Sequence, residues 1–379
     1  MKIYMRQKTT NQKTAPKTIT EVPVALGNRS YSIFIGNGLL SDTGNQLKKM
    51  GLGRTLGIVT NPTVGPLYLD PLLEGLNKEG FRTEVFLIPD GESYKTLETI
   101  KDIYQRMLSA HFDRSSTLIA LGGGVIGDMT GFAAATYMRG IPFLQVPTSL
   151  EAQVDASVGG KVAVDLPEGK NLVGAFYQPQ GVFIDLEVLK SLPVRELSSG
   201  LSEVIKYGII WDQEFFSYLE ENIDKVFQYD MDILRHIVKR SCEIKAEVVS
   251  QDETEQGIRA ILNFGHTVGH AIETLTGYQA VRHGEGVGMG MIAACLMADQ
   301  MGLGSGKITS QVQNLVQRAK LPTTLPELDV DKILETMLYD KKAKEGKITM
   351  VLPEKIGKTI IMEVEDLNPV KNAIRQMMR

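Results

Sequence analysis

Three of the five histidines in the sequence lie close together, at His266, His270 and His283. The first two stand four residues apart, which places both side chains on one face of a helix and makes them the first candidate metal pair. His283 follows in a His-Gly-Glu sequence at the start of the next apolar segment. Imidazole nitrogens grouped in this way are typical ligands of zinc, and a carboxylate would complete the set. A single histidine is more often structural, but this grouping favours a metal site.

A glycine loop supplies a second chemical signal. Gly122, Gly124 and Gly127 match the pattern G-x-G-x-x-G, between an apolar strand-like run and a helix-like segment. Glycines let the backbone approach a pyrophosphate, and the start of the following helix offers free N–H groups. The alternative is a tight turn without a ligand. The acidic residue that grips a ribose about twenty residues later in a Rossmann unit is missing, so we predict a dinucleotide site with an unusual layout.

Lysine and asparagine follow glycine in two short stretches, VGGK and GKN, which end at Lys161 and Asn171. Taken singly, each is most simply a solvated surface residue, but such positions also suit an anionic or phosphorylated ligand. Other lysine and arginine residues occur in motif-like segments that also contain aspartate or glutamate. They are Arg139, Lys206, Lys245 and Arg259, with Asp155, Glu203 and Glu255. This combination favours a small polyanionic substrate instead of a polymer.

The first half of the chain has to position the glycine loop, and its pattern is that of an α/β domain. Strands are expected at 55–60, 83–88, 117–121, 143–147 and 181–184. Helical segments at 68–79, 97–110 and 129–138 alternate with them. Strands that alternate with helices of about ten or more residues predict a mostly parallel sheet.

The second half, which carries the histidines, is dominated by segments of helical period. Helices are expected at 195–210, 213–221, 231–250, 257–276 and 284–301, with a short strand near 346–352. We therefore predict a disordered extension over 1–20, a dinucleotide-binding α/β domain over 21–190 and an α-helical domain over 191–379.

Composition restricts the class of protein. A chain of 379 residues suggests two domains, and the net charge of −4 argues against a nucleic-acid or membrane-surface binder. No apolar stretch is long enough to cross a bilayer, and the basic start of the chain lacks the apolar core of a secretory signal. Two cysteines without metal or redox spacing indicate reduced, buried thiols. We expect a cytoplasmic enzyme.

Seven stretches, in order, resemble the 3-dehydroquinate synthase family of sugar phosphate cyclases. They are PDGESYKT, ALGGGVIGDMTGFAAATYMRG, PTSLEAQVDASVGGK, GKNLVGAFYQP, SGLSEVIKYGI, RAILNFGHTVGHAIE and HGEGVGMGM. The resemblance runs from about residue 55 to residue 357. It implies a Rossmann-like NAD-binding domain followed by a helical metal- and substrate-binding domain, in a homodimer.

The reaction that the resemblance implies is a shikimate-pathway step toward aromatic amino acids and chorismate, catalysed by a carbon–oxygen lyase. It converts 3-deoxy-D-arabino-heptulosonate 7-phosphate to 3-dehydroquinate and phosphate. In the family, NAD takes a hydride from C5, phosphate is eliminated, and the hydride returns. Ring opening and an aldol closure complete the carbocycle.

By position, the resemblance implies that Glu203, His266 and His283 are the metal ligands, with zinc or cobalt as the ion. This replaces the pair chosen by spacing, because His270 then matches a residue near the substrate phosphate. Other matched positions are Lys161, Asn171, Asn263 and Arg139 on the phosphate side, Arg259 and Lys245 as a carboxylate clamp, and Asp155, Lys206 and Glu255 around the ring hydroxyls. Lys341 or Lys342 matches a late lysine that closes over the phosphate, and Arg139 matches an arginine that is donated across a dimer interface.

For NAD, the resemblance implies contacts from a separate group of residues. They are Asn61, Glu92, Lys95, Gly123, Gly124, Asp128, Thr148, Ser149, Lys161 and Lys170. Two positions depart from the family pattern. Glu151 stands near the nicotinamide side where an apolar or small residue is expected, and Asp165-Leu166 replaces Asn-His. Both departures are expected to tune cofactor affinity without touching the core catalytic groups.

Three alternative functions share parts of this pattern. An inosose or valiolone synthase would share the fold, NAD and zinc but not the carboxylate clamp. A metal-dependent polyol dehydrogenase of the glycerol dehydrogenase type would release reduced NAD, and VGGK, GKN and EVIK argue against it. A non-catalytic NAD-binding regulator would be expected to have lost ligands or lysines that this chain retains.

Overall fold

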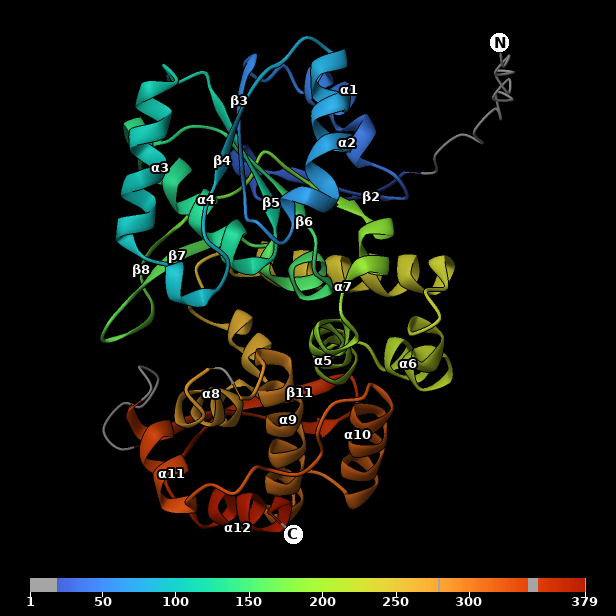
Figure 1. The fold of residues 1–379 in the computed structure, drawn as a ribbon. Helices are drawn as coiled ribbons and strands as arrows, with labels where there is room; N and C mark the ends of the chain where they lie inside the picture. Colours follow the sequence, from blue (N-terminus) through green and yellow to red (C-terminus); the bar gives the residue numbers. More distant parts are fainter. Residues whose placement is uncertain (1–18, 279, 340–346, 379) are drawn as a thin grey trace, which may run out of the picture.

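The computed structural model describes residues 19–278, 280–339 and 347–378. The sheet and its covering helices form one half of the molecule, and a helical assembly forms the other (Figure 1). The predicted α/β architecture with a mostly parallel sheet is confirmed. The division into domains near residue 190 stays a prediction. Lys341 and Lys342 lie outside the described residues, as does most of the predicted N-terminal extension.

The central sheet has seven strands in the order β1-β2-β9-β6-β5-β3-β4. They are β1 (Thr20–Val24), β2 (Tyr31–Gly36), β3 (Thr55–Thr60), β4 (Arg82–Leu87), β5 (Thr117–Gly122), β6 (Phe143–Pro147) and β9 (Gly181–Asp185). Only β1 runs antiparallel to its neighbour, β2. Neither β1 nor β2 was predicted from the sequence, and β1 begins at Thr20, the last residue of the predicted extension.

Helices cover both faces of this sheet, which explains why its central strands are apolar throughout. Successive residues of a strand point to opposite faces. Accordingly, Ile58 and Ile119 pack on the side of α1 (Thr43–Lys49) and α2 (Gly65–Lys78). Their neighbours Val59 and Leu118 pack on the opposite side, with α3 (Leu97–Ser109) and α4 (Gly124–Thr136) (Figure 1).

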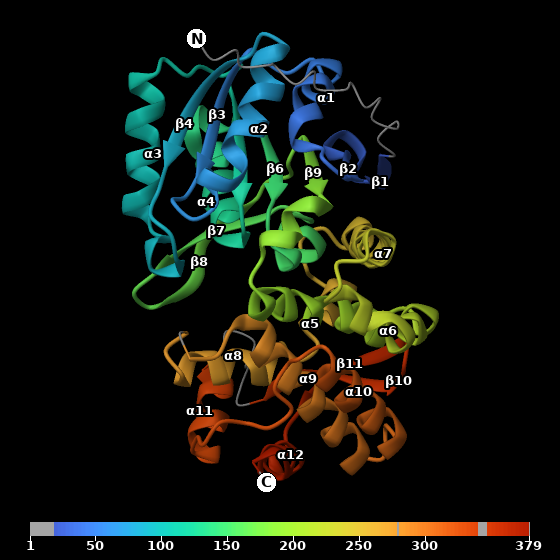
Figure 2. The same ribbon diagram turned by 45° about the vertical axis from the view of Figure 1, so that its right-hand side comes forward.

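The helical half is assembled around α9 (His283–Gln300), whose residues are buried along most of its length. Its neighbours are α5 (Val194–Ile210), α8 (His266–Leu275), α10 (Gly306–Arg318), α12 (Asn368–Met377) and the strand β10 (Ile348–Lys355), which pairs with β11 (Lys358–Val364). The remaining helices are α6 (Gln213–Val226), α7 (Met231–Gln251) and α11 (Val330–Tyr339). In Figure 2, α7 lies between the sheet and the lower helices.

Two predicted elements need correction. The single helix predicted over 257–276 is wrong: a 3-10 turn at Ile258–Asn263 is followed by Gly265, whose φ of 80° breaks the helix before α8 begins. The helix predicted from residue 129 begins earlier, at Gly124, inside the glycine loop. The local apolar periodicity could not locate either boundary, because both depend on glycine backbone conformations.

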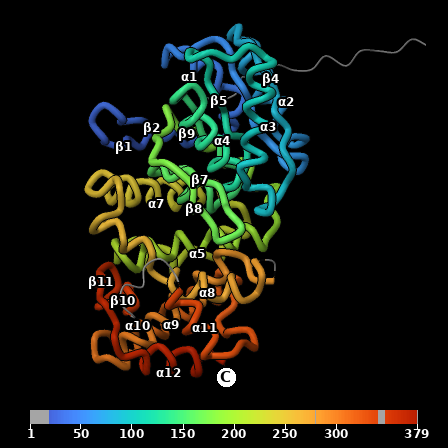
Figure 3. The backbone as a smooth tube through the Cα atoms, turned by 90° about the vertical axis from the view of Figure 1, so that its left-hand side faces the viewer, coloured from blue at the N-terminus to red at the C-terminus, as the bar shows by residue number. Residues whose placement is uncertain are grey.

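A hairpin that the sequence analysis missed lies beside the sheet. Its strands are β7 (Lys161–Leu166) and β8 (Gly169–Phe176), and its tip points toward α8 (Figures 1 and 3). Cys242 and Cys295 are buried and unpaired, as predicted. Among the described helices, none is both long and apolar enough to cross a membrane.

Candidate metal and dinucleotide site

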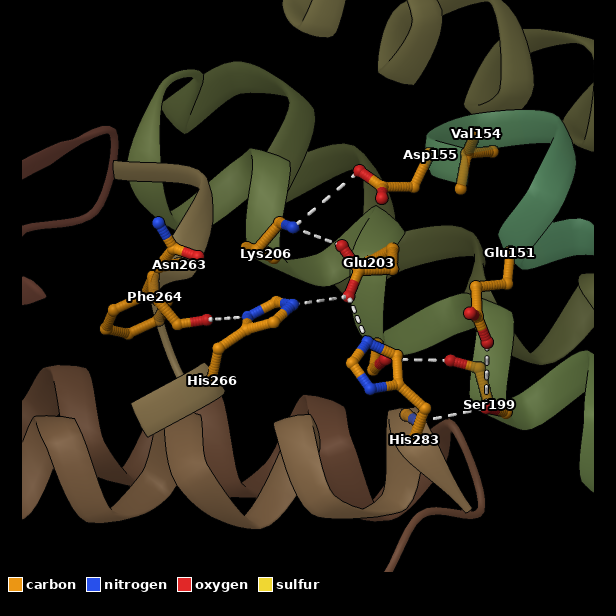
Figure 4. Close-up of polar contacts among 12 residues, drawn as sticks. Glu151, Val154, Asp155, Ser199, Glu203, Lys206, Asn263, Phe264, His266 and His283 are labelled. Carbon is orange, nitrogen blue, oxygen red and sulfur yellow. Dashed lines mark hydrogen bonds and ion pairs between the residues drawn. The ribbon is translucent and has the colours of Figure 1, made fainter. Parts of the chain in front are cut away.

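Three helices of the helical half bring a carboxylate and two imidazoles together (Figure 4). Glu203 lies in α5, while His266 and His283 are the first residues of α8 and α9. The Nε2 atoms of His266 and His283 lie 3.5 and 3.7 Å from the same oxygen, Oε1 of Glu203. That oxygen is buried and has no hydrogen-bond partner. A buried carboxylate oxygen facing two imidazole nitrogens fits a divalent metal such as zinc.

The other polar atoms of the trio are already engaged. Lys206 donates to Oε2 of Glu203, which leaves Oε1 for an ion. Nδ1 of His266 donates to the carbonyl of Phe264 at 3.1 Å, so its Nε2 presents a lone pair. Burial, with help from the Lys206 ammonium, lowers the pKa of His266 well below its ordinary value. A neutral imidazole is the form that binds metal.

Among the residues that the structure describes, two groups of side chains have the spacing of a metal site. The first is the Glu203, His266 and His283 group, and the second consists of His270, Glu273 and His283. Only the first contains a buried oxygen without a partner. The assignment of Glu203, His266 and His283 as ligands stays a prediction.

Glu273, which was not predicted from the sequence, accepts a hydrogen bond on its carboxylate from Nδ1 of His283 at 3.0 Å. It stands seven residues after His266 and therefore on the same helix face, a spacing that could have identified it.

Asp155 and two lysines form a charged group next to the trio. Nζ of Lys245 lies 2.8 Å from Oδ1 of Asp155, and Nζ of Lys206 lies 3.9 Å from it. Tyr207 donates its hydroxyl to the same oxygen at 2.6 Å. Burial alone would raise the pKa of Asp155, but the Lys245 and Lys206 ammonium groups outweigh it and hold the pKa well below the usual range. Asp155 is therefore ionised in the site.

The predicted phosphate-side and hydroxyl-side residues are partly brought together. Lys161 forms an ion pair with Glu255, and Nδ2 of Asn263 donates to Oε1 of Glu255 at 2.7 Å. Glu255 has a positive φ of 59°, a conformation that is uncommon outside glycine and often marks functional sites. His270 is close to the trio, with its ring centre 5.3 Å from that of His266.

Both residues of the predicted carboxylate clamp, Arg259 and Lys245, donate hydrogen bonds to one short segment. Arg259 is 2% exposed and its Nη2 donates to the carbonyl of Gly159 at 3.0 Å. Lys245 donates to the backbone carbonyl of Asp155 at 2.7 Å. Both cations are therefore held against residues 155–159.

Other predicted substrate residues lie apart from this group. The Asn171 side chain accepts from Nζ of Lys95 at 2.6 Å, so in this structure it joins the predicted NAD residues instead of Lys161. Arg139 is exposed, with a positive φ of 69°, at the turn after α4. Their roles toward the phosphate stay predictions.

Several of the predicted NAD residues lie in or near α4 and the neighbouring strand ends. Lys95 is buried and forms an ion pair with Asp128 at 2.6 Å. Burial raises the pKa of Asp128 even though Lys95 opposes this. Glu92 pairs with Lys170 at 3.2 Å. Asn61 is buried at the carboxyl end of β3, where its side chain donates to Asp90 and accepts the backbone N–H groups of Thr63 and Val64, just before α2.

Space for a ligand is left at the glycine loop. A Cβ on Gly123 would meet nothing nearer than Oγ of Ser149 at 3.6 Å, and one on Gly124 would be 3.4 Å from Cβ of Ala156. Thr148 and Ser149 follow β6 on the adjacent side, where the Thr148 N–H donates to the Gly122 carbonyl. A loop with spare room at a helix start fits a pyrophosphate.

The two departures from the family pattern have local explanations. Oδ1 of Asp165 accepts the backbone N–H of Asn171 at 2.8 Å, which stabilises the positive φ of Asn171. Glu151 faces Ser199 of α5, with 3.4 Å between Oε2 and Oγ, and burial raises the pKa of Glu151 to about 7.

Comparison with known proteins agrees with the resemblance. Residues 85–199 match the family model for the 3-dehydroquinate synthase N-terminal region, and residues 200–343 match that for the C-terminal region. The 3-dehydroquinate synthase of Rippkaea orientalis is 50% identical over 356 residues, which cover 93% of this chain and 97% of that protein.

Solved structures of sugar phosphate cyclases have the same fold. A 2-deoxy-scyllo-inosose synthase complexed with carbaglucose-6-phosphate, NAD+ and Co2+ has a TM-score of 0.86 and 27% identity, covering 94% of this chain and all of that chain. The 2-epi-5-epi-valiolone synthase of Streptomyces hygroscopicus subsp. jinggangensis, with NAD+ and Zn2+ bound, has a TM-score of 0.85 and 26% identity, covering 93% and 98%. From the family models and the sequence identity, the chain belongs to the 3-dehydroquinate synthase family.

Proposed function

We propose that this chain converts 3-deoxy-D-arabino-heptulosonate 7-phosphate to 3-dehydroquinate and phosphate, as an NAD- and metal-dependent lyase. The observation that carries the proposal is the buried Glu203 oxygen facing two imidazole nitrogens, in a chain half identical to a curated member of the family. When bound, NAD supplies a hydride acceptor that is restored within each turnover, and zinc or cobalt supplies Lewis-acid polarisation of the C4 and C5 oxygens.

The protein's own residues bind and orient the substrate. Arg259 offers a planar fork and Lys245 a point charge, which together suit the substrate carboxylate. Both are fixed to residues 155–159 by hydrogen bonds, so they are preorganised before the substrate arrives. This clamp favours a carboxylate-bearing substrate over those of the inosose and valiolone synthases.

Lys161, Asn263 and His270 are proposed to hold the phosphate. Glu255 is a shared partner of Lys161 and Asn263, and a phosphate oxygen would replace its carboxylate in both contacts. Asp155, Lys206 and Glu255 would then face the ring hydroxyls. We further propose a cytoplasmic homodimer, in which the exposed Arg139 reaches the phosphate of the partner subunit's site.

One assay tests the function. Purified protein is incubated with NAD, Co2+ or Zn2+ and the heptulosonate phosphate, while phosphate release and reduced-NAD absorbance are followed. Stoichiometric phosphate without net reduced NAD is expected. Absence of phosphate would contradict the proposal, and reduced NAD accumulating with a polyol would favour a dehydrogenase. Glucose 6-phosphate, which lacks a carboxylate, is the control substrate and should release no phosphate.

A further inference from the structure

We propose that Glu273 is a positioning residue of the metal site, whose carboxylate holds Nδ1 of His283 and thereby directs Nε2 toward the ion. This inference rests on the proposed metal site at Glu203, His266 and His283. Glu273 belongs to none of the substrate, NAD or metal positions that the family resemblance implies.

The imidazole of His283 lies between two buried carboxylates. Its Nδ1 is 3.0 Å from Oε1 of Glu273, and its Nε2 is 3.7 Å from Oε1 of Glu203. The two glutamate side chains are only 6% and 1% exposed. Because Nδ1 donates to Glu273, the proton is kept on that nitrogen and Nε2 is left as the metal-binding atom.

The two imidazoles of the site are therefore held by different groups. The Nδ1 atom of His266 has a neutral backbone carbonyl, that of Phe264, as its partner at 3.1 Å. The partner of His283 is a carboxylate, which increases the basicity of the ring as a ligand. Removing the Glu273 charge should thus weaken the bond from His283 without altering His266.

The backbone around His283 is fixed independently of Glu273. The Gly284 N–H donates to Oγ of Ser199 at 3.0 Å, and a Cβ on Gly284 would lie 2.0 Å from the Ser199 carbonyl oxygen. These contacts determine where α9 begins on α5. They leave the rotation of the imidazole ring undetermined, because that torsion has a broad, roughly two-fold preference. In the part of the chain that the structure describes, Glu273 is the hydrogen-bond partner of Nδ1 and thereby selects one of the two ring orientations.

Close packing of α8 on α9 allows the Glu273 side chain to reach the ring. A Cβ on Gly286 would lie 3.1 Å from the Gly269 carbonyl oxygen and 3.3 Å from Oε1 of Glu273. The carboxylate is therefore enclosed at the contact between the two helices. Any larger residue at position 286 would compete with it for space.

A second interpretation makes Glu273 a ligand, in the His270, Glu273 and His283 group. In that arrangement the metal would take Nδ1 of His283 and the Glu203 oxygen would remain without a partner. The two interpretations differ in how much binding should be lost when Glu273 is changed. Loss of an orienting group costs about ten- to hundred-fold in affinity, whereas loss of a ligand should abolish the site.

The test measures Co2+ binding to the metal-free full chain, without substrate or turnover. Affinity is obtained by competition with a chromophoric chelator, and ligand geometry from the visible absorption bands of Co2+. The variants are Glu273→Gln, which keeps an acceptor but no charge, and Glu273→Met, which keeps neither. Glu285→Gln is the matched control, because Glu285 lies two residues after His283 in the first turn of α9 but pairs with Arg195. Thermal unfolding checks that each variant folds.

We expect Glu273→Met to weaken Co2+ binding up to about 100-fold, with shifted absorption bands, and Glu273→Gln to weaken it about 10-fold. The control should bind as the wild type does. Wild-type affinity and spectrum in Glu273→Met would overturn the positioning role alone. Complete loss in Glu273→Met, equal to that in His283→Ala, would identify Glu273 as a ligand and also overturn it. A wild-type chain that binds no Co2+ would overturn the metal site itself and the proposed function with it.

Discussion

The chain has two glycine-rich regions that look alike in sequence but differ in what surrounds them. At the dinucleotide loop, a Cβ on Gly123 would have 3.6 Å to its nearest neighbour. In α9, a Cβ on Gly284 or Gly290 would lie 2.0 or 1.9 Å from a carbonyl oxygen of α5 or of the segment before α8. The first region leaves room that a ligand can take, and the second is filled by protein.

The difference shows that glycine serves two purposes here. In the loop it lets a pyrophosphate approach the backbone at a helix start. In the helical half it lets α5, α8 and α9 approach one another closely enough to bring Glu203, His266 and His283 within ligand distance. The loop therefore serves the cofactor directly, whereas the α9 glycines serve the metal through the packing of its ligands.

The largest effect should follow from Gly290→Ala. Its Cβ would overlap the Gly265 carbonyl, which directly precedes His266, so α8 and α9 must separate. We expect a loss of about 3 kcal/mol or more in the free energy of unfolding, together with loss of Co2+ binding. Urea denaturation and chelator competition measure the two effects.

Gly288→Ala in the same helix is the control for that experiment. Its Cβ would lie 3.4 Å from Leu321, an ordinary contact, and alanine gains up to about 1 kcal/mol over glycine within a helix. Equal stability of the two variants would show that the α9 glycines are not needed for close approach.

The next largest effect distinguishes a histidine that binds the metal from one that does not. His283→Ala should lose the metal and activity together, because Nε2 of His283 faces the unpartnered oxygen of Glu203. His270→Ala should retain the metal and lose activity toward the phosphorylated substrate. Metal content after dialysis is the measurement, and metal loss in His270→Ala would show that the ligand assignment is wrong.

A smaller and more selective effect is expected from Gly123→Ala. The residue has a φ of −77° and free space around it, so the alanine should fold with an unchanged melting temperature. The added methyl group would occupy the space proposed for the pyrophosphate and weaken NAD binding by about ten-fold, or 1.4 kcal/mol. Fluorescence titration with NAD checks this, with unchanged Co2+ affinity as the control. Unchanged NAD affinity would indicate that the loop is only a structural turn.

An effect that appears only as a change in pH dependence concerns the contact between the two halves, where Gly200 of α5 packs on the backbone of Glu151. Burial raises the pKa of Glu151 from 4.5 to about 7. The folded state therefore holds this proton to higher pH than the unfolded chain does. In the metal-free protein, this contribution to stability is complete below about pH 4.5 and is lost as the pH rises through 7.

Glu151→Gln should remove that pH dependence. Relative to wild type, the metal-free variant should gain about 2.5 kcal/mol of stability between pH 5 and pH 8. Urea denaturation at the two pH values is the measurement. Parallel stability profiles for the two proteins would contradict the prediction and place Glu151 in a solvated environment.

Much of the α/β half could be predicted from the sequence, because its signals are local. The run TLGIVT indicates a strand by its apolar pattern alone, and the glycine loop indicates a tight turn by its backbone freedom. Accordingly, β3 and β5 lie where they were predicted. The hairpin β7–β8 was missed because it pairs mainly with itself beside α4, where burial is partial and the alternation of apolar residues is weak.

The sequence by itself determined the parallel sheet, the glycine loop, the clustered histidines and, through seven ordered motifs, the family. Only the tertiary structure decided how the metal site is put together. Spacing alone favours His266 with His270, yet the Nε2 atoms of His266 and His283 face an oxygen of Glu203, which belongs to a different helix. The physical reason is that helix periodicity orders side chains within one helix, whereas contacts at glycines such as Gly284 and Gly290 determine which helices meet.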